Sequence, residues 1–189
     1  NKVEIKTILT EIAKAPSAQR IEKDIRTLAG FGTRHTLSDT VSHVRGIGAA
    51  RRWIKSEFEQ ISKDCNNCLE VSYHKGLAKK DDKRITKDTW IVNVIAIQRG
   101  TVNPDRYVIM SGDIDSRISD VNNFTDDAPG ANDNASGMAG TMEAARILSK
   151  YKFPVSIIYV GLSGEEQGLL GGKFLAETEN EKGWDIIAV

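Results

Sequence analysis

Three groups of carboxylates are the residues of this sequence best suited to chemistry. Asp113 and Asp115 follow one apolar run, Glu165 and Glu166 follow another, and Asp133 lies between them in a Pro-Gly-Ala-Asn-Asp-Asn segment. Carboxylates gathered at strand ends are oxygen ligands of the kind that divalent cations bind. Of two adjacent glutamates, one can bind a metal while the other acts as a base. The pattern predicts a metal-dependent hydrolase.

Two of the three acidic groups also have a purely structural interpretation. Asp133 precedes an expected helix and could serve only as its N-cap. Glu165 and Glu166 could be surface residues near the positive end of the next helix. Adjacent carboxylates that leave solvent repel each other and usually need a cation. The three groups together therefore favour a metal more than any one of them alone.

Such a set could hydrolyse an amide. A carboxylate that bridges two divalent cations would hold them about 3.5–4 Å apart, with a water as nucleophile and the substrate carbonyl between them. A neighbouring glutamate could take the proton of the water and pass it to the leaving amine. The mechanism is complete only if the remaining ligands exist.

Composition narrows the class of protein. The 189 residues predict one domain, 1–189, with a sizeable core. Lysine plus arginine and aspartate plus glutamate both total 26, so no net charge attracts the chain to nucleic acid or to an anionic membrane. No apolar run approaches the roughly 20 residues that span a bilayer. Asn1-Lys2-Val3 lacks an initiator methionine and a signal-peptide core, so we expect a processed or shortened N-terminus.

The two cysteines form one Cys-Asn-Asn-Cys motif, Cys65 to Cys68. A single pair cannot complete a four-ligand zinc site, and its place between a helix end and a strand is not typical of a redox motif. We expect a short disulfide or two inert thiols. A disulfide would indicate an oxidising compartment.

The elements that must position the carboxylates change along the chain. Residues 1–64 have helical periodicity, with one helix opening at 17–20 and stopping at 30–32, and a longer one over 44–62. The stripe expected to be buried in the longer helix comprises Ile47, Ala50, Trp53, Ile54, Phe58 and Ile61. Residues 69–189 alternate between strands and helices. Strands are expected over 69–73, 90–97, 107–110, 155–162 and 184–189, helices over 135–150 and 169–178, and a solvated hairpin loop over 79–84.

This alternation predicts an α/β fold in which helices cover both faces of a mostly parallel sheet, a three-layer α/β/α arrangement. Sites in such folds collect beyond the carboxyl ends of the strands, where all three acidic groups fall.

Three segments, 111–117, 128–137 and 163–171, resemble the central motifs of the co-catalytic zinc aminopeptidases. Relatives of these secreted bacterial leucyl-type enzymes include glutamate carboxypeptidase, glutaminyl cyclase and the transferrin receptor ectodomain. Segments 31–34 and 143–146 also resemble the family. The resemblance implies a zinc-exopeptidase fold with up to two zinc ions.

The resemblance implies a role for each carboxylate. Asp133 corresponds to the ligand that bridges two zinc ions and Glu166 to a ligand of one zinc. Glu165 corresponds to the general base, and Asp115 to the aspartate that orients the neighbouring ligand. Asp113 stands where the family has a histidine ligand, which changes the charge and reach of that donor. His35, His43 and His74 match no ligand position of the family.

A second departure concerns length. The family has an aspartate ligand after the strand that begins here near Ile186, and a histidine ligand much further along. The resemblance therefore implies the N-terminal part of a catalytic domain that lacks its C-terminal side. We expect the 189 residues alone to be inactive, or to need a second chain or further segment that supplies ligands.

Together these observations favour a secreted or periplasmic zinc aminopeptidase that acts on peptides and binds neither nucleic acid nor membrane. Two alternatives stay open: a peptidase-like binding module without catalysis, and a single-zinc enzyme with glutaminyl-cyclase-like chemistry.

Overall fold

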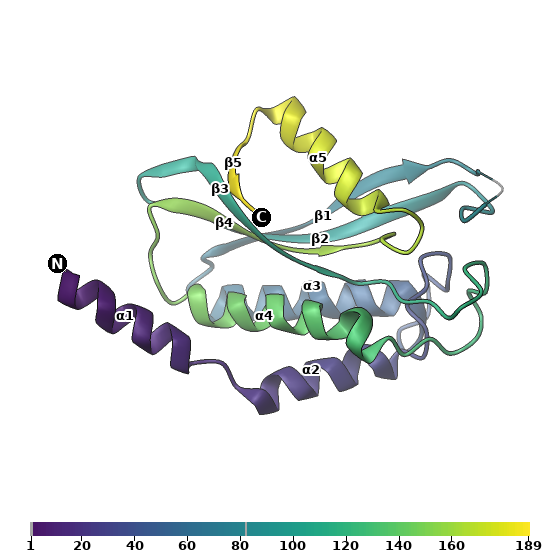
Figure 1. The fold of residues 1–189 in the computed structure, drawn as a ribbon, viewed down its shortest axis with the longest axis horizontal. Helices are drawn as coiled ribbons and strands as arrows, with labels where there is room; N and C mark the ends of the chain where they lie inside the picture. The colour runs from purple at the N-terminus through teal and green to yellow at the C-terminus, as the bar shows by residue number, and fades with distance from the viewer. Residues whose placement is uncertain (1, 82) are drawn as a thin grey trace.

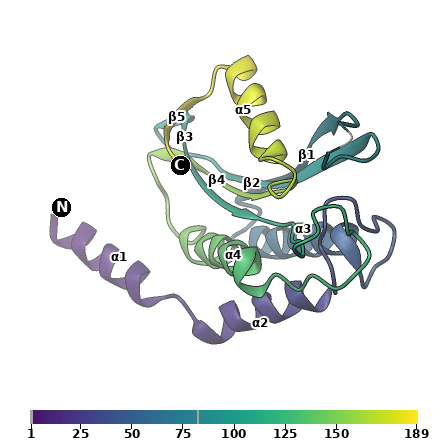
Figure 2. The same ribbon diagram turned by 45° about the vertical axis from the view of Figure 1, so that its right-hand side comes forward.

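The computed structural model describes residues 2–81 and 83–189, so Asn1 and Asp82 lie outside the described residues. A five-stranded sheet separates two layers of helices (Figure 1). Helices α3 (Gly46–Asp64) and α4 (Ser136–Leu148) cover one face, and α5 (Leu170–Lys182) covers the other (Figure 2). This arrangement confirms the three-layer α/β class.

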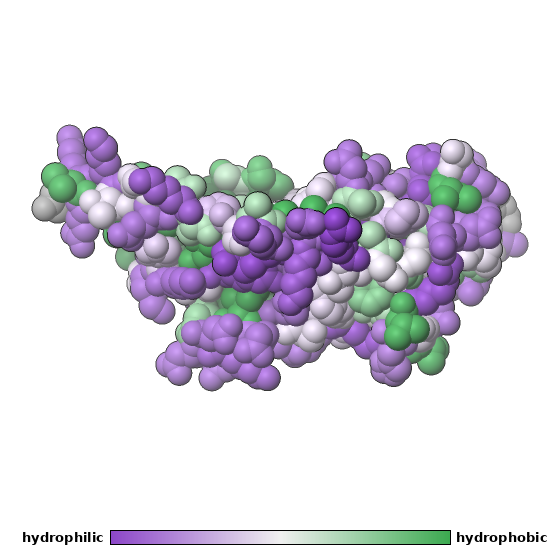
Figure 3. Space-filling model, turned by 90° about the horizontal axis from the view of Figure 1, so that it is seen from below, coloured by the Kyte–Doolittle hydropathy of each residue, from purple (hydrophilic) through white to green (hydrophobic). Residues whose placement is uncertain are grey.

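Two further helices lie outside these layers. Helix α2 (Ala18–Gly30) contacts α4 on the side away from the sheet, and α1 (Lys2–Lys14) extends from the body without a buried residue (Figure 1). Seen from below, this side of the molecule is mostly polar, with scattered apolar patches (Figure 3). Among the described residues, no helix has both the length and the apolar character that crossing a membrane requires.

The strand order is β1-β2-β4-β3-β5, and the sheet is mixed. Its strands are β1 (Leu69–Ala78), β2 (Thr89–Gln98), β3 (Asn103–Asp113), β4 (Val155–Leu162) and β5 (Asp185–Ala188). β3 is parallel to both β4 and β5, whereas β2 is antiparallel to both β1 and β4. The expectation of a mostly parallel sheet was therefore correct only for β3, β4 and β5. The chain passes directly from β1 to β2 through residues 79–88, as expected for an antiparallel pair, and Asp82 of the predicted hairpin loop 79–84 lies outside the described residues.

An irregular loop over residues 31–45 separates α2 from α3, between the helix end predicted at 30–32 and the helix start predicted at 44. Gly46 ends this loop with a φ of 87°, and a Cβ there would collide with the backbone of Asp39. The Asp39 carboxylate in turn accepts the N–H groups of Val41 and Ser42. Such local side-chain bonds compete with helical ones and keep the segment out of a helix.

The main core lies between α3, α4 and the sheet. Five of the six residues predicted as the buried stripe of α3 are buried, and Trp53 is half-buried. A second cluster, between the other face of the sheet and α5, includes Ile95, Ile158 and Leu175. The sheet is thus buried on both faces, as its apolar strands predicted.

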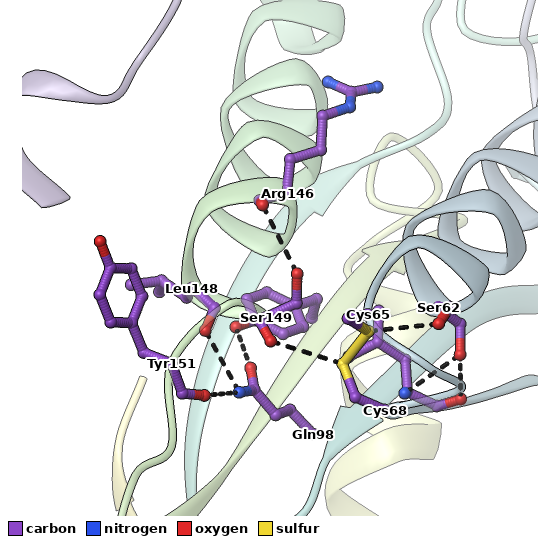
Figure 4. The surroundings of a disulfide bond; sticks show 10 residues. Ser62, Cys65, Cys68, Gln98, Arg146, Leu148, Ser149 and Tyr151 are labelled. Carbon is purple, nitrogen blue, oxygen red and sulfur yellow. Dashed lines mark hydrogen bonds between the residues drawn. A yellow bond between two sulfur atoms is a disulfide. The ribbon is translucent and has the colours of Figure 1, made fainter.

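Cys65 and Cys68 form a disulfide between the end of α3 and the start of β1 (Figure 4). Of the two alternatives drawn from the sequence, the structure has the disulfide. The Cys68 sulfur lies 3.6 Å from the carbonyl oxygen of Ser149, which follows α4.

Candidate metal centre

The parallel pairing of β3 and β4 brings two of the acidic groups to one end of the sheet. Asp113, the last residue of β3, is in register with Leu162, the last residue of β4. Glu165 and Glu166 follow in the tight turn that leads to α5. Parallel strands end at a common edge, so the position predicted for these carboxylates is confirmed.

A buried carboxylate holds this turn in place. Asp115 is 2% exposed, and its two oxygens accept the backbone N–H groups of Glu165, at 3.2 Å, and of Glu166, at 3.1 Å. The Thr36 hydroxyl donates to it as well, at 3.1 Å. Burial raises the pKa of Asp115, and these donors oppose the rise. Asp115 therefore links the end of β3 to the turn after β4.

Asp133 lies in the short kinked turn Ala131–Ala135 that precedes α4, and its own backbone is not helical, with φ −114° and ψ 98°. The N-cap residue of α4 is Ala135, and no side chain caps it, so the interpretation of Asp133 as an N-cap is wrong. The next residue, Asn134, accepts the backbone N–H of Asp113 at 3.2 Å. This bond holds the Asp133 turn against the end of β3.

Arg34 also connects the residues that follow β3 to the residues that precede the Asp133 turn. Its guanidinium is 1% exposed and donates to the carbonyl oxygens of Ile114 at 2.8 Å, Pro129 at 2.7 Å and Gly130 at 3.0 Å. A fourth bond reaches Leu28 at 3.0 Å. Burial lowers the pKa of Arg34 to about 10, so it stays charged at neutral pH. No role of Arg34 was predictable beyond its place in a segment that resembles the family, because most of its partners are backbone groups far along the chain.

The site carries unbalanced negative charge. Burial, followed by repulsion from Asp115 and Glu165, raises the pKa of Asp113 to about 6. Burial also raises the pKa of Glu165, and the charge of Glu166 adds to this effect. A bound cation would relieve both, which is the electrostatic setting that carboxylate ligands provide.

The structure divides the predicted residues between two environments. Asp113 and Glu165 line one cavity of about 380 Å³. Its other lining residues, mostly apolar, are Leu162, Ser163, Leu169, Gly172, Lys173 and Ala176. Asp133 and Glu166 are not among them. Glu166, whose side chain is 11% exposed, bonds instead to Arg117, with Oε2 2.5 Å from Nε. The interpretation of Glu166 as a surface residue is wrong.

These residues do not form a complete metal site by themselves. Within residues 2–81 and 83–189, no three His, Cys, Asp or Glu side chains converge on a point where an ion could be held. The histidine rings bond elsewhere: His35 Nε2 lies 3.0 Å from the Val121 carbonyl, and His74 Nε2 lies 2.9 Å from the Thr178 hydroxyl. The donor set is carboxylate, which suits a divalent cation, but it is too small to enclose one. The metal roles of Asp113, Asp133 and Glu166 stay predictions.

Comparison with known proteins agrees with this reading of the motifs. The sequence pattern described as peptidase family M28 matches residues 93–189. A probable zinc metalloprotease of Pyrenophora teres f. teres is 41% identical over 182 residues, which are 96% of this chain and 39% of the relative. One from Leptosphaeria maculans is 46% identical over 178 residues, covering 93% of this chain and 39% of the relative. The chain thus spans about two fifths of the length of these curated relatives.

Solved structures share the fold at low sequence identity. The Legionella pneumophila LapA aminopeptidase superposes with a TM-score of 0.70 at 20% identity, covering 98% of this chain and 44% of that one. The Fimbriiglobus ruber glutaminyl cyclase gives 0.68 at 18% identity, covering 92% and 59%. Both likenesses extend over nearly the whole chain, including the sheet that carries the acidic groups.

Proposed function

The chain belongs to peptidase family M28, and from that premise we propose that it forms part of a zinc-dependent aminopeptidase. Glu165 would be the general base, and Asp113, Asp133 and Glu166 would be zinc ligands. The observation that carries the proposal is the shared cavity of Asp113 and Glu165 at the ends of two parallel strands. The names of the zinc metalloprotease relatives and of the LapA aminopeptidase support the metal and the reaction class.

Zinc in such a site would supply a Lewis acid that activates a water and polarises the substrate carbonyl. The residues of this chain would do the rest. A raised pKa makes the Glu165 carboxylate a better proton acceptor near neutral pH. The Asp115 carboxylate accepts the backbone N–H groups of Glu165 and Glu166, which limits the positions that both side chains can take. The apolar walls of the cavity would exclude water around the base.

The remaining ligands would come from outside these 189 residues, from a further segment of the protein or from a second chain. Two observations support this part of the proposal. The described residues hold no group of three converging ligands. The matched relatives are more than twice as long as the aligned region.

We also propose an oxidising, extracytoplasmic compartment for the protein. The disulfide between Cys65 and Cys68 supports it, since disulfides persist in secreted and periplasmic proteins and are rare in the cytosol.

The test is hydrolysis of an aminoacyl-4-nitroanilide by the protein in its full natural length. Wild type should be active, lose activity on dialysis against a chelator and regain it with zinc. Glu165→Gln should retain zinc, measured by elemental analysis, and lose activity by about 10²–10⁴-fold, the range of a general base. An N-acetylated peptide should not be cleaved. Zinc-independent hydrolysis, or full activity in Glu165→Gln, would refute the proposal, and cyclisation of N-terminal glutamine without cleavage would favour the cyclase alternative.

A further inference from the structure

A buried amide on β2 spans both ends of the turn that carries Glu165 and Glu166. Asn93 is only 1% exposed. Its Oδ1 accepts the N–H of Ser163 at 2.9 Å, and its Nδ2 donates to the carbonyl of Gly171 at 2.9 Å. Ser163 comes directly after β4 and Gly171 lies in the first turn of α5. One carboxamide therefore bridges the start and the end of the segment 163–171.

The two ends also bond to each other, which makes the segment a closed loop. The N–H of Gly171 donates to the carbonyl of Ser163 at 2.8 Å, and the N–H of Leu170 donates to Gly164 at 2.9 Å. The contact is so close that a Cβ at Gly171 would collide with Ser163 O and with Asn93 Oδ1. The hydroxyl of Ser163 adds a bond to the Val92 carbonyl at 2.8 Å. The loop is thus closed at its base directly over β2.

The bridge continues to neighbouring elements. Nδ2 of Asn93 lies 3.2 Å from Nδ1 of His74 on β1, and Nε2 of His74 lies 2.9 Å from the hydroxyl of Thr178 on α5. The orientation of the carboxamide is fixed, since Ser163 N–H can only donate and Gly171 C=O can only accept. Asn93 therefore fixes the loop base relative to two strands and a helix.

We propose that Asn93 is a positioning residue for Glu165. Asp115 restrains the loop near Glu165 and Glu166, and Asn93 restrains its base, so the two side chains together determine where the Glu165 carboxylate lies in the cavity. This role rests on the proposed function, in which Glu165 is the general base. A shift of a reacting group by about 1 Å can lower the rate about 100-fold. Loss of the Asn93 hydrogen bonds at the base of the loop could therefore have a large effect on catalysis.

The chain offers a matched control in the same strand. Gln98, the last residue of β2, is 6% exposed and is also a buried amide, whose Nε2 donates to two carbonyl oxygens, those of Leu148 at 3.2 Å and Tyr151 at 2.8 Å (Figure 4). Its Oε1 accepts the hydroxyl of Tyr159 at 2.9 Å. Asn93→Asp and Gln98→Glu therefore make the same chemical change, amide to carboxylate, at the middle and at the end of one strand.

The experiment compares these two variants in the full-length, zinc-loaded protein. Asn93→Asp should lower kcat by about 100-fold with KM and zinc content unchanged, whereas Gln98→Glu should leave kcat unchanged for the folded fraction. Amide hydrogen exchange of segment 163–171 should become about tenfold faster in Asn93→Asp only, and exchange of residues 147–152 faster in Gln98→Glu only. If Asn93→Asp does not fold, Asn93→Ser, whose hydroxyl can reach only one end of the loop, takes its place.

The measurements of kcat and of hydrogen exchange separate the positioning role of Asn93 from the proposed function. Equal kcat in Asn93→Asp and Gln98→Glu, or unchanged exchange of segment 163–171 in Asn93→Asp, would overturn the positioning role. If wild type hydrolyses no peptide at all, the proposed function fails, while the exchange measurement still decides whether Asn93 holds the loop.

Discussion

Arg117 and Glu166 form an ion pair in which Nε lies 2.5 Å from Oε2. A residue proposed to bind zinc is therefore already bonded to a cation of its own chain. Arg84 contacts the same residue, since its Nη1 donates to the Glu166 carbonyl at 2.6 Å. Acidic residues surround this pair: the charge of Asp115 raises the pKa values of both Asp113 and Glu165, and the charge of Glu165 raises that of Asp113.

Replacement of Arg117 by glutamine should tighten zinc binding. The change frees Glu166 and removes a positive charge, and both effects favour a cation. A partly exposed ion pair contributes about 0.5–1 kcal/mol, so we expect a dissociation constant about two- to fivefold lower, with the gain reduced by salt. Chelator competition at two ionic strengths measures it.

Arg106→Gln is the control for Arg117, because it removes the same charge from an ion pair with Asp185, near the other end of β3. Its zinc affinity should match wild type. Weaker binding in Arg117→Gln than in this control would mean that Arg117 orients Glu166 for the metal and does not compete with it.

Asp113→Asn should stabilise the metal-free protein at neutral pH. The folded-state pKa of Asp113 is about 6, above its ordinary value of 3.8, so the folded protein binds this proton more tightly than the unfolded chain does. The charged carboxylate therefore destabilises the fold above about pH 6, and the effect disappears below about pH 4. We expect a gain of about 1–2 kcal/mol in the free energy of unfolding at pH 8 and none at pH 4.

Urea unfolding in the presence of a chelator, at both pH values, tests this. Asp88→Asn provides a contrast, since hydrogen bonds from Lys79 and Lys80 lower the pKa of Asp88, and its removal should not stabilise the protein at pH 8. An Asp113→Asn variant that is less stable than wild type at pH 8 would show that the carboxylate makes favourable contacts that outweigh repulsion.

The disulfide should contribute modestly to stability and not to catalysis. Cys65 and Cys68 are only three positions apart, so the bond restricts a short loop, and the chain-entropy estimate is about 2 kcal/mol. Cys65→Ala/Cys68→Ala should lose about that much in urea unfolding with kcat unchanged. Wild type in reducing buffer should show the same loss, and the double variant should not respond to the reductant. A loss of activity in the folded double variant would count against a purely structural disulfide.

Periodicity was sufficient to predict the helices and strands of this fold, because α3, β2 and β4 bury long apolar faces. It placed residues 33–43 between two helices but could not predict their path, which a local Asp39 turn and the conformation of Gly46 decide. Nor could it give the antiparallel partners of β2, since strand pairing depends on connections and not on the apolar pattern of a strand.

The carboxylates of the candidate site were recognisable because they follow strands, where α/β folds place their sites. The residues that hold these carboxylates in place were not recognisable from the sequence. Arg34 and Asn93 bond to carbonyl and N–H groups 70 or more positions away, such as Ile114 and Gly171. Every residue offers such backbone groups, so no side-chain pattern in the sequence identifies which ones a buried polar residue will reach.

Arg34→Met should destabilise the protein more than any other substitution named above. It leaves the carbonyl groups of Ile114 and Leu28 without their donor in a buried region and those of Pro129 and Gly130 in a partly buried one, at a cost of about 1–3 kcal/mol for each group that water cannot reach. We expect a loss of at least about 3 kcal/mol in urea unfolding. Arg34→Lys keeps the charge but not the planar fork of donors, so its free energy of unfolding should lie between those of wild type and Arg34→Met. Arg52→Met is the control, because half-buried Arg52 also donates only to backbone carbonyls, those of Thr40, Val41 and Ser42, in bonds that lie at the protein surface. Solvent can replace those bonds, so its loss should stay below about 1 kcal/mol. Equal losses in Arg34→Met and Arg52→Met would show that the Arg34 contacts do not hold the Asp113 and Asp133 segments together.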